Sequence, residues 1–416
     1  MDTNFKSNFL NTLSERGFLN QCSNYDGLDN LLHNKKIKAY IGFDCTANSL
    51  HIGSLIQIFI LKYLQDFGHT PVILLGGGTT LIGDPSGKDE ARKMLSTEDI
   101  NNNLLGIKSV LEKFVSFSVN NKAIMLNNID WLAKFNYLDF LRDYGKEFTI
   151  NRMLSFDSVK LRLQREQPLT FLEFNYMLLQ AVDYLYLHKN YDVQLQMGGS
   201  DQWGNIINGV ELIRRVSQGE VYGLTTPLLT KSDGTKMGKT ANGAVWLSEN
   251  MFSSWDFYQF FRNVDDLDVI KFLKLFTTLP LSQINDLAKL KDKEINEAKK
   301  ILAFEITSIV HSQKSALECQ NLAINTFENK TLDSNLPTYF VDEAQLNEGI
   351  ILANYLTSIG LSSSNSNAKK LIQNNGIKVN DDAIADINYK LFKANIKNDC
   401  IKISLGKKNH ILVKIK

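Results

Sequence analysis

The stretch YIGFDCTANSLHIGSL, residues Tyr40–Leu55, decides the fold of the first half of the chain. It reads as the end of a strand, a loop, and a helix that is entered through the four residues HIGS at 51–54. An apolar helical pattern follows, and then a second β-rich run, TPVILLGG, at 70–77. A strand, a helix and a second strand at this spacing predict a βαβ unit, and therefore a parallel sheet with ligand-binding loops at the carboxyl ends of its strands.

The composition is that of a folded protein with more than one domain. The chain has 416 residues, of which 44% are hydrophobic and 22% are charged, and this length suits two or three domains. The four cysteines are widely spaced and form no C-x-x-C pair, so neither a disulfide framework nor a metal site is predicted. Without an apolar run of membrane-spanning length or a secretory signal pattern, the sequence predicts a cytoplasmic protein that spans no membrane.

Changes of pattern along the chain predict three domains and a linker. Residues 1–250 alternate strands and helices, residues 251–325 are helical and charged, and a polar, Asn-rich linker is expected at 326–346. Residues 347–416 read as two short helices, a turn and a β-hairpin around Gly406. The predicted fold class is α/β: a Rossmann-like doubly wound parallel sheet, followed by an α-helical domain and a small α+β domain.

The C-terminal end carries the positive charge. From Glu348 to Lys416 there are eleven lysines and five acidic residues, a net charge of +6, whereas the rest of the chain sums to −5. A basic end on a mildly acidic body is typical of an appendage that binds a polyanion. Charge alone fits a lysine-rich solvated surface equally well, so both interpretations stay open at this point.

The glycine-rich run LLGGGTTLIGDPSGKD at 74–89 invites a phosphate-loop interpretation, which its spacing contradicts. Gly83 and Gly87 are separated by only three residues, and Lys88 is followed by Asp89 rather than by Ser or Thr. The dinucleotide fingerprint is absent too, because Leu81 stands where its third glycine should be. Kinase and dehydrogenase functions therefore lose most of their support.

Two other motifs suit a phosphate-binding site better. His51 and Gly53 begin a helix, so backbone N–H groups and the positive end of the helix dipole face the preceding loop. Far downstream, Lys236 and Lys239 bracket a glycine in KMGKT, and two ammonium groups on a mobile loop suit the charge that develops on a pyrophosphate. A lone His-x-Gly arises by chance, and a lone lysine loop is typical of a solvated hairpin. The two motifs together, in this order and on this fold pattern, favour a site that binds phosphate groups.

A polar stripe runs along an otherwise apolar helix. In YMLLQAVDYL, Tyr176, Gln180 and Asp183 stand at positions i, i+4 and i+7 on one helical face, and the residues between them are apolar. Polar groups on a buried helix need hydrogen-bonding partners. From the residues alone, the stripe faces solvent, is satisfied by neighbouring strands, or lines a binding site.

On these motifs the chain resembles tyrosyl-tRNA synthetase of the bacterial type, a class I aminoacyl-tRNA synthetase family. HIGS matches the class signature HIGH except at Ser54, and KMGKT matches the KMSKS signature in the form that this family tends to use. Further similarity comes from YIGFDCTA, TLIGDPSGK, EFNYMLLQAVD and MGGSDQWGNI. The resemblance covers essentially the whole chain, and the basic C-terminal end is similar to an RNA-binding domain of the ribosomal-protein-S-four type.

The resemblance implies how the amino acid would be recognised. The tyrosine-binding residues that it implies are Tyr176, Gln180 and Asp84 at the amino group, Tyr40 and Asp183 at the phenolic hydroxyl, and Gln196 and Gln202 elsewhere in the pocket. Phenylalanine would leave a buried carboxylate and a buried hydroxyl without a partner. The tyrosine enzymes of this family are themselves the established example of such discrimination, which is about 10⁵ without an editing site.

The resemblance also implies which residues handle ATP. The implied ATP-binding residues are Gly42, Asp44, His51, Gly53, Ser54, Gly198, Gly199, Asp201, Lys236 and Lys239. The implied catalytic residues are Thr46, His51, Lys88, Arg92, Lys236, Lys239 and Thr240. Ser54 is shorter than the histidine of the class signature, so we expect only a weak ATP contact from it.

The expected activity is that of a tyrosine–tRNA ligase, in two steps. The carboxylate of L-tyrosine attacks the α-phosphate of ATP, and a ribose hydroxyl at the 3′ end of tRNA(Tyr) then takes the tyrosyl group. The attacking carboxylate is already ionised, so catalysis consists of positioning and charge stabilisation. Mg²⁺ is expected to accompany ATP. The resemblance further implies a homodimer, with no membrane and no DNA among the partners.

Two alternatives remain at this stage. A tryptophanyl-type synthetase shares the fold and both signatures, and only the pairing of Asp183 with Tyr40 favours a phenol over an indole. A non-catalytic RNA-binding protein on a degenerate synthetase fold is the alternative from a different class. The intact His51, Lys236 and Lys239 argue against it.

Overall fold

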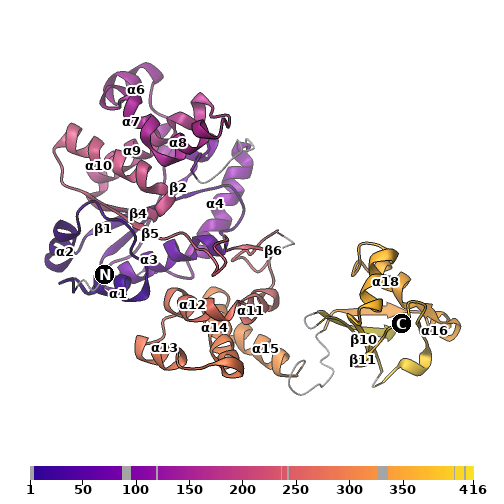
Figure 1. The fold of residues 1–416 in the computed structure, drawn as a ribbon. Coiled ribbons are helices and arrows are strands. Elements are labelled where there is room, and N and C mark those ends of the chain that lie inside the picture. The colour runs from indigo at the N-terminus through magenta and orange to yellow at the C-terminus, as the bar shows by residue number, and fades with distance from the viewer. Residues whose placement is uncertain are drawn as a thin grey trace. The chain divides into compact units, whose positions relative to one another are not determined.

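The computed structural model describes residues 4–86, 95–118, 120–235, 237–240, 243–325, 336–397, 399–406 and 409–416. The chain divides into two compact units, Met1–Cys319 and Gln320–Lys416. The larger unit holds a sheet with helices packed around it and a helical region that follows (Figure 1). Within the described residues, no helix is long and apolar enough to cross a membrane.

The sheet of the larger unit is parallel throughout. In spatial order its strands are β3 (Ile124–Asn127), β2 (Thr70–Gly76), β1 (Lys38–Asp44), β4 (Val193–Gly199) and β5 (Tyr222–Thr226). The order reverses at β1, where Tyr40 lies opposite Val72 of β2 on one side and Gln196 of β4 on the other. The predicted doubly wound parallel sheet is confirmed, and its reversal point, where such sheets bind ligands, lies between β1 and β4.

Helices cover both faces of this sheet. Because crossovers between parallel strands are right-handed, the helix that follows β1 and the helices on either side of β4 lie on opposite faces. One face carries α3 (Leu55–Asp66), against which α1 (Asn8–Arg16) packs; the other carries α9 (Phe171–Tyr191) and α10 (Trp203–Ser217), which pack against each other (Figure 1). Strands covered on both faces read as continuous apolar runs, and β2 is accordingly buried from Pro71 to Gly76.

The remaining elements of the larger unit are shorter or lie outside the sheet. Around the sheet they are α2 (Tyr25–Asn34), α4 (Thr97–Leu111), α5 (Ile129–Leu132), α6 (Tyr137–Asp143), α7 (Ile150–Ser155), α8 (Asp157–Gln164) and the hairpin β6 (Lys239–Thr240) and β7 (Gly243–Ala244). The helical region consists of α11 (Ser254–Arg262), α12 (Val269–Phe276), α13 (Leu281–Leu287), α14 (Ile295–Val310) and α15 (Gln313–Ala323).

The helical region packs onto the sheet layer, and the two belong to the same compact unit as far as Cys319. The buried guanidinium of Arg16 donates from Nη1 to the carbonyls of Lys274 and Thr277, at 3.0 and 2.9 Å. These carbonyls belong to the C-terminal end of α12, where a cation is favoured by the helix dipole. Lys113 Nζ likewise donates to the carbonyl of Val310, at the end of α14, at 3.0 Å.

In its described residues, the smaller unit combines a five-stranded sheet with short helices. The sheet follows the order β11 (Asp382–Ala383), β10 (Ile377–Val379), β13 (Ile401–Leu405), β14 (Asn409–Ile415) and β8 (Thr338–Val341), and the helices are α16 (Glu343–Glu348), α17 (Leu352–Ser358) and α18 (Asn365–Gln373). A separate two-stranded pair joins β9 (Ile350–Ile351) to β12 (Lys390–Leu391). The hairpin expected around Gly406 corresponds to β13 and β14, which pair antiparallel.

The expected linker at 326–346 is too long. Its second half folds with the smaller unit, because β8 pairs in parallel with β14 and α16 begins at Glu343. The sequence concealed this strand because TYFV is only four residues long and follows a polar, Asn-rich run. Residues 326–335 lie outside the described part of the chain. The division into three functional domains stays a prediction.

Helix α4 holds the loop that follows β1. Asn103 Nδ2 donates to the carbonyl of Cys45 at 2.9 Å, and the backbone N–H of Cys45 donates to Thr80 Oγ1 at 2.7 Å. A Cβ at Gly106 would lie only 2.2 Å from the carbonyl oxygen of Asn48. Backbone atoms cannot give way without displacing the chain, so the course of this loop depends on the absence of a side chain at position 106.

We expect Gly106→Ala to lower the free energy of unfolding by about 1–3 kcal/mol, because the added methyl group overpacks the contact with Asn48. Helix propensity alone would favour alanine by up to about 1 kcal/mol. Urea denaturation measures the difference. Gly145→Ala is the matched control, since its Cβ would meet Leu141 Cδ2 at an ordinary 3.5 Å. A Gly106→Ala variant as stable as the wild type would contradict the claim that the loop after β1 requires a residue without a side chain at position 106.

Candidate active site

A cavity of about 320 Å³ lies at the carboxyl ends of β1 and β4. The predicted site residues that line it are Tyr40, Gly42, Asp44, Thr46, His51, Gly53, Ser54, Asp84, Tyr176, Gln180, Asp183, Gln196, Gly198, Gly199, Asp201 and Gln202. They come from β1 and its loop, the loop after β2, one face of α9, and β4 with the turn that follows. The structure therefore brings these residues together, while the role of each stays a prediction.

Five predicted residues cannot be placed in this way. Lys88, Arg92 and Lys236 lie outside the described residues. For Lys239 and Thr240 the structure describes only the backbone, which forms strand β6 of a short hairpin.

Two rows of polar side chains face each other across the cavity. Tyr40 and Asp44 point to the same side of β1, because side chains alternate along a strand, and Tyr176 and Asp183 share one face of α9. The rows run in opposite directions: the Tyr176 hydroxyl donates to Asp44 Oδ2 at 3.2 Å, whereas Asp183 lies close enough to Tyr40 to raise its pKa. Four strand residues span about 13 Å and seven helix residues about 10 Å, so the rows match in length.

Asp183 is a buried carboxyl group held by two donors. Its side chain is only 1% exposed; Oδ2 accepts from Asn128 Nδ2 at 2.8 Å and Oδ1 from Trp131 Nε1 at 2.7 Å. Burial raises the pKa of Asp183 to about 7, and the two hydrogen bonds act in the opposite direction. Beside it, burial and the Asp183 charge raise the pKa of Tyr40 well above its usual value. The buried Tyr40 hydroxyl has no hydrogen-bond partner among the described residues.

Asn128 and Trp131 were not identified from the sequence. Asn128 is itself fixed, because its Oδ1 accepts from the backbone N–H of Gly78 at 2.8 Å and its Nδ2 lies 3.0 Å from Thr79 Oγ1. The available signal was the run NNIDW, which places polar side chains directly after β3, at the carboxyl end of a parallel strand. Trp246, Leu228 and Gln57 also line the cavity without having been predicted.

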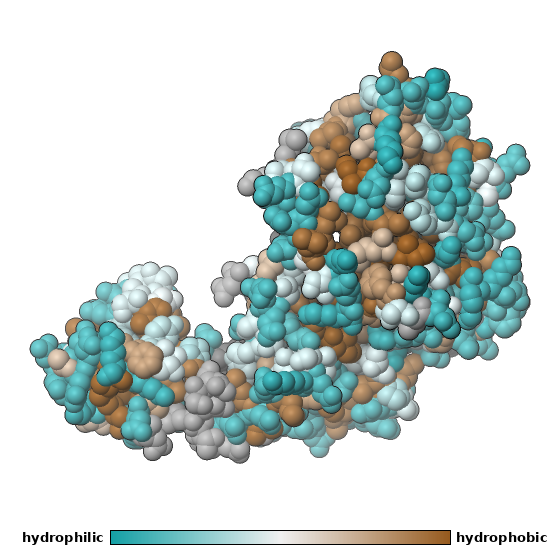
Figure 2. Space-filling model, turned by 180° about the vertical axis from the view of Figure 1, so that it is seen from behind, coloured by the Kyte–Doolittle hydropathy of each residue, from teal (hydrophilic) through white to brown (hydrophobic). Residues whose placement is uncertain are grey.

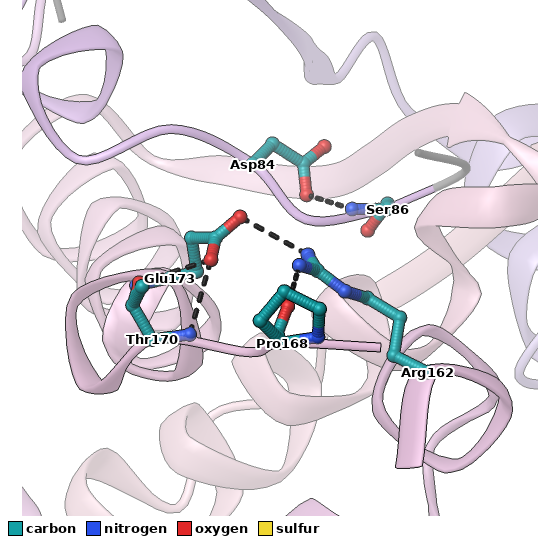
Figure 3. A network of polar contacts seen from close by, with 6 residues as sticks. All are labelled: Asp84, Ser86, Arg162, Pro168, Thr170 and Glu173. Atoms are coloured by element: carbon teal, nitrogen blue, oxygen red, sulfur yellow. Dashed lines mark hydrogen bonds and ion pairs between the residues drawn. The ribbon is translucent and has the colours of Figure 1, made fainter. Parts of the chain in front are cut away.

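The opposite end of the cavity is rich in hydrogen-bond acceptors. Asp84 accepts from Gln202 Nε2 at 2.8 Å. It also accepts from the backbone N–H of Ser86 at 2.9 Å (Figure 3). Gln180 stands between Tyr176 and Asp183 on α9, and Gln196 lies opposite Tyr40 in the sheet. The Oε1 atoms of both are buried and have no partner among the described residues. An unpaired buried acceptor is costly unless a ligand donates to it. The set therefore suits a cationic donor such as an ammonium group.

The first turn of α9 is fixed by a buried ion pair (Figure 3). Arg162 Nη1 lies 3.0 Å from Glu173 Oε1, and both side chains are almost fully buried. The same guanidinium donates to the carbonyl of Pro168, and Glu173 closes a capping box with Thr170. Burial acts to raise the pKa of Glu173, but hydrogen bonds from Thr170 and Arg162 lower it below its usual value. These contacts hold the first turn of α9, the helix that carries Tyr176 and Asp183, in a fixed position.

The HIGS motif has a specific local geometry. The backbone N–H of Gly53 donates to His51 Nδ1 at 2.9 Å, so Nδ1 is unprotonated and the neutral ring carries its proton on Nε2. A Cβ at Gly53 would lie 2.6 Å from His51 Cε1. The glycine is therefore required for the histidine to fold back over the 3₁₀ turn Ile52–Ser54 that precedes α3. Nε2 is left as the donor of the ring.

Comparison with protein families divides the chain near residue 327. A family model described as tRNA synthetases class I (W and Y) matches residues 32–328, and one described as the tyrosine–tRNA ligase SYY-like C-terminal domain matches residues 327–413. The tyrosine–tRNA ligase of Wolbachia pipientis subsp. Culex pipiens (strain wPip) is 56% identical over 411 residues, 98% of either chain. That of Caulobacter vibrioides (strain NA1000 / CB15N) is 53% identical over 413 residues, 99% of either chain.

Solved structures give the same picture for the larger unit. A C-terminally truncated Aspergillus nidulans mitochondrial tyrosyl-tRNA synthetase superposes with a TM-score of 0.69 at 30% identity, covering 77% of this chain and 94% of that one. Plasmodium falciparum tryptophanyl-tRNA synthetase superposes with a TM-score of 0.53 at 15% identity, covering 75% of this chain and 84% of that one. The second likeness concerns the fold alone.

The shifted pKa of Asp183 predicts a pH dependence of stability. The folded chain holds the Asp183 proton with a pKa of about 7, against 3.8 for the free side chain. The stability that this proton confers is complete below pH 4 and is lost as the pH rises through 7. Relative to Asp183→Asn, we expect the wild type to lose about 1 kcal/mol of unfolding free energy per pH unit between pH 5 and 7. Urea denaturation of both proteins in half-unit steps tests this; a difference independent of pH would contradict it.

Proposed function

This chain belongs to the family of class I tRNA synthetases for tryptophan and tyrosine, and we infer that its cavity binds L-tyrosine and ATP side by side. The activity is that of a tyrosine–tRNA ligase (EC 6.1.1.1), because relatives with this activity are more than half identical along their full length. Its substrates are L-tyrosine, ATP and tRNA(Tyr). We propose that the reaction takes place in the cytoplasm.

The observation that supports tyrosine recognition is the buried pair of Tyr40 and Asp183. The Tyr40 hydroxyl has no partner among the described residues, and Asp183 is positioned by Asn128 and Trp131. A phenolic hydroxyl both donates and accepts, so it would donate to Asp183 and accept from Tyr40. Phenylalanine would leave the buried Tyr40 hydroxyl without a partner and would offer no donor to Asp183. An indole N–H only donates, so it could not match the pair as fully.

The acceptors at the other end would hold the amino group of the substrate. An ammonium group has three donors and no acceptor, which suits Asp84, Gln180 and the Tyr176 hydroxyl around it. Gln196 and Gln202 would complete the pocket. With both ends held, the substrate carboxylate would face the ATP side of the cavity, where Gly198, Gly199 and Asp201 are proposed to contact the adenosine together with Gly42 and Asp44.

Catalysis of the first step would consist of alignment and charge stabilisation. The tyrosine carboxylate attacks the α-phosphorus of ATP, the bond to the bridging oxygen breaks, and pyrophosphate leaves with the electron pair. His51 would donate from Nε2 to a phosphate oxygen, because Nδ1 is occupied by the Gly53 N–H. Thr46 and Ser54 line the same side. The remaining proposed phosphate contacts are Lys88, Arg92, Lys236, Lys239 and Thr240. Such contacts act most strongly when charge develops in the transition state.

We propose that Mg²⁺ arrives with the ATP phosphates. Among the residues that the structure describes, no group of three or more His, Cys, Asp or Glu side chains could hold a metal ion. Mg²⁺ characteristically stays on substrate phosphates with few protein ligands, which supports this proposal. No step is assigned to the metal.

The direct test is ATP–pyrophosphate exchange by the full-length protein with L-tyrosine, L-phenylalanine and L-tryptophan in parallel. We expect exchange with tyrosine only, at least about 10³-fold above the other two amino acids in kcat/KM, because each lacks the phenolic hydroxyl. Exchange without added amino acid is the background control. Equal exchange with tryptophan, or none with tyrosine, would contradict the proposal.

The smaller unit is the proposed tRNA-binding appendage. Some of its lysines are neutralised, as in the pair of Lys402 with Asp381 at 2.9 Å. Others, including Lys369 and Lys370 on α18, are exposed. Exposed ammonium groups release counterions from a nucleic-acid backbone, which gives affinity without sequence readout. The helical region α11–α15 is the second proposed tRNA surface.

We expect a chain truncated after Asn325 to keep tyrosine-dependent exchange within about twofold of the wild type, because the cavity lies wholly in the larger unit. Charging of tRNA(Tyr) should fall by about 100-fold or more at physiological salt, because several phosphate contacts are lost. Lowering the salt concentration should reduce the difference in tRNA(Tyr) charging between the truncated chain and the wild type. A loss of both activities together would contradict this division.

We propose that the protein is a homodimer that buries an apolar surface on α6–α9. Exposed large apolar side chains gather on these helices: Tyr137, Leu138, Leu141, Ile150, Leu154, Leu161, Leu163, Phe171 and Leu172. Apolar surface is visible at the end of the larger unit where α6, α7 and α8 lie (Figure 2). Patches of this kind mark interaction surfaces more often than they are left in water.

Sedimentation velocity tests the dimer. We expect the wild type to sediment as a dimer and Leu138→Asp, at a position 72% exposed in the single chain, to shift it towards monomer. Leu267→Asp is the control, because Leu267 is 81% exposed but lies in the turn before α12. A monomeric wild type would exclude the homodimer, and a Leu138→Asp variant that stays dimeric would exclude this surface as its interface.

A further inference from the structure

The chain that leaves the β6–β7 hairpin returns directly to the HIGS motif. The backbone N–H of Ile52 donates to the carbonyl of Val245, and that of Leu247 donates to the carbonyl of Leu50, both at 2.9 Å. Between these bonds His51 and Trp246 face each other as an antiparallel bridge. Residues 50–52 and 245–247 thus form a short two-stranded ribbon between segments that are nearly 200 residues apart in sequence.

The side chains of the bridged pair are in contact. The rings of His51 and Trp246 meet edge to face, with centroids 6.1 Å apart and planes inclined at 63°, a geometry that aromatic pairs favour. His51 is held from another direction by the Gly53 N–H at Nδ1. Trp246 is only partly buried, and it lines the cavity together with His51 and Gly53. The imidazole therefore rests between a backbone donor and an indole.

The same ribbon fixes the base of the hairpin. Val245, which accepts from Ile52 on one side, donates from its backbone N–H to the carbonyl of Gly238 at 3.0 Å. Gly238 has φ of +113°, and a Cβ there would lie 2.9 Å from Ile52 Cγ2. The backbone of Val245 thus links Ile52 at the start of the HIGS turn to Gly238 at the start of the hairpin, and Val245 directly precedes Trp246.

We infer that Trp246 is a positioning residue for adenylate formation, which holds the His51 imidazole in the orientation that presents Nε2 to the ATP phosphates. The inference rests on the proposed role of His51. An unsupported imidazole would lose alignment with the reacting phosphate, and misplacement by about 1 Å costs on the order of 10²-fold in rate. Trp246 touches no reacting atom in this account and acts entirely through His51.

A double-mutant cycle on ATP–pyrophosphate exchange tests this account. The variants are Trp246→Leu, His51→Ala and the double substitution, with kcat and both KM values measured for the full-length protein. We expect Trp246→Leu to lower kcat by about tenfold or more while KM for tyrosine changes less than about twofold, because only a transition-state contact is lost. In the His51→Ala background the same change should lower kcat by less than about threefold, because its target is gone.

Two further variants keep the test decisive. Trp246→Phe retains a ring edge against His51, so we expect its kcat to be close to that of the wild type. If Trp246→Leu folds poorly, the double-mutant cycle is measured with Trp246→Phe in its place. Trp255→Leu is the control for loss of an indole, because Trp255 stacks on Tyr258 in α11, at 6.5 Å between centroids, away from the cavity lining.

The outcomes separate this inference from the proposed function. Equal losses from Trp246→Leu with and without His51, or a rise in KM for tyrosine as large as the fall in kcat, would overturn the positioning role. A wild type without tyrosine-dependent exchange would overturn the proposed function itself and the inference with it.

Discussion

The position of β1 is the constraint on which the rest of the larger unit depends. Its hydrogen bonds to β2 on one side and β4 on the other place it where the strand order reverses. Helices on the two sides of this point cover opposite faces, so the crevice between them stays open at the carboxyl ends of the strands. The HIGS motif follows the loop at 45–50 that leaves β1, and it therefore lies at this edge of the sheet. A cavity at this place is therefore a consequence of topology, and the side chains only determine what it binds.

What the cavity binds follows from two polar rows that are matched along their length. The Tyr176 hydroxyl pairs with Asp44 at one end, and Tyr40 lies beside Asp183 at the other. The rigid start of α9, fixed by the Arg162–Glu173 ion pair, sets the register of one row. Within the cavity, the Tyr40 hydroxyl and the Oε1 atoms of Gln180 and Gln196 are buried and have no hydrogen-bond partner among the described residues. A substrate with an ammonium group and a phenolic hydroxyl would supply partners to such groups.

Local sequence patterns revealed strand β1 and the polar stripe on α9, the family resemblance pointed to Tyr40 and Asp44, and neither identified the residues that hold Asp183 in place. Strand β1 and the stripe on α9 were predictable because periods of 2 and 3.6 residues can be read within one segment. Asn128 and Trp131 were not predictable in this way, because they reach Asp183 from a segment more than 50 residues earlier, and only the folded chain brings them together. Trp246 was not predictable either, because it meets His51 only in the folded chain, nearly 200 residues further along the sequence. The linker was overextended because β8 is too short to show a period and is stabilised by its pairing with β14.

The most direct measurement of the central claim, that Tyr40 and Asp183 read the phenolic hydroxyl, is calorimetric binding of L-tyrosine and L-phenylalanine without ATP. We compare the wild type with Tyr40→Phe, which removes one buried hydroxyl and little volume. A lost hydrogen bond of about 1 kcal/mol or more should weaken tyrosine binding at least about fivefold. Phenylalanine binding should stay equal or improve, so that the ratio of the two dissociation constants narrows. An unchanged ratio would contradict the account.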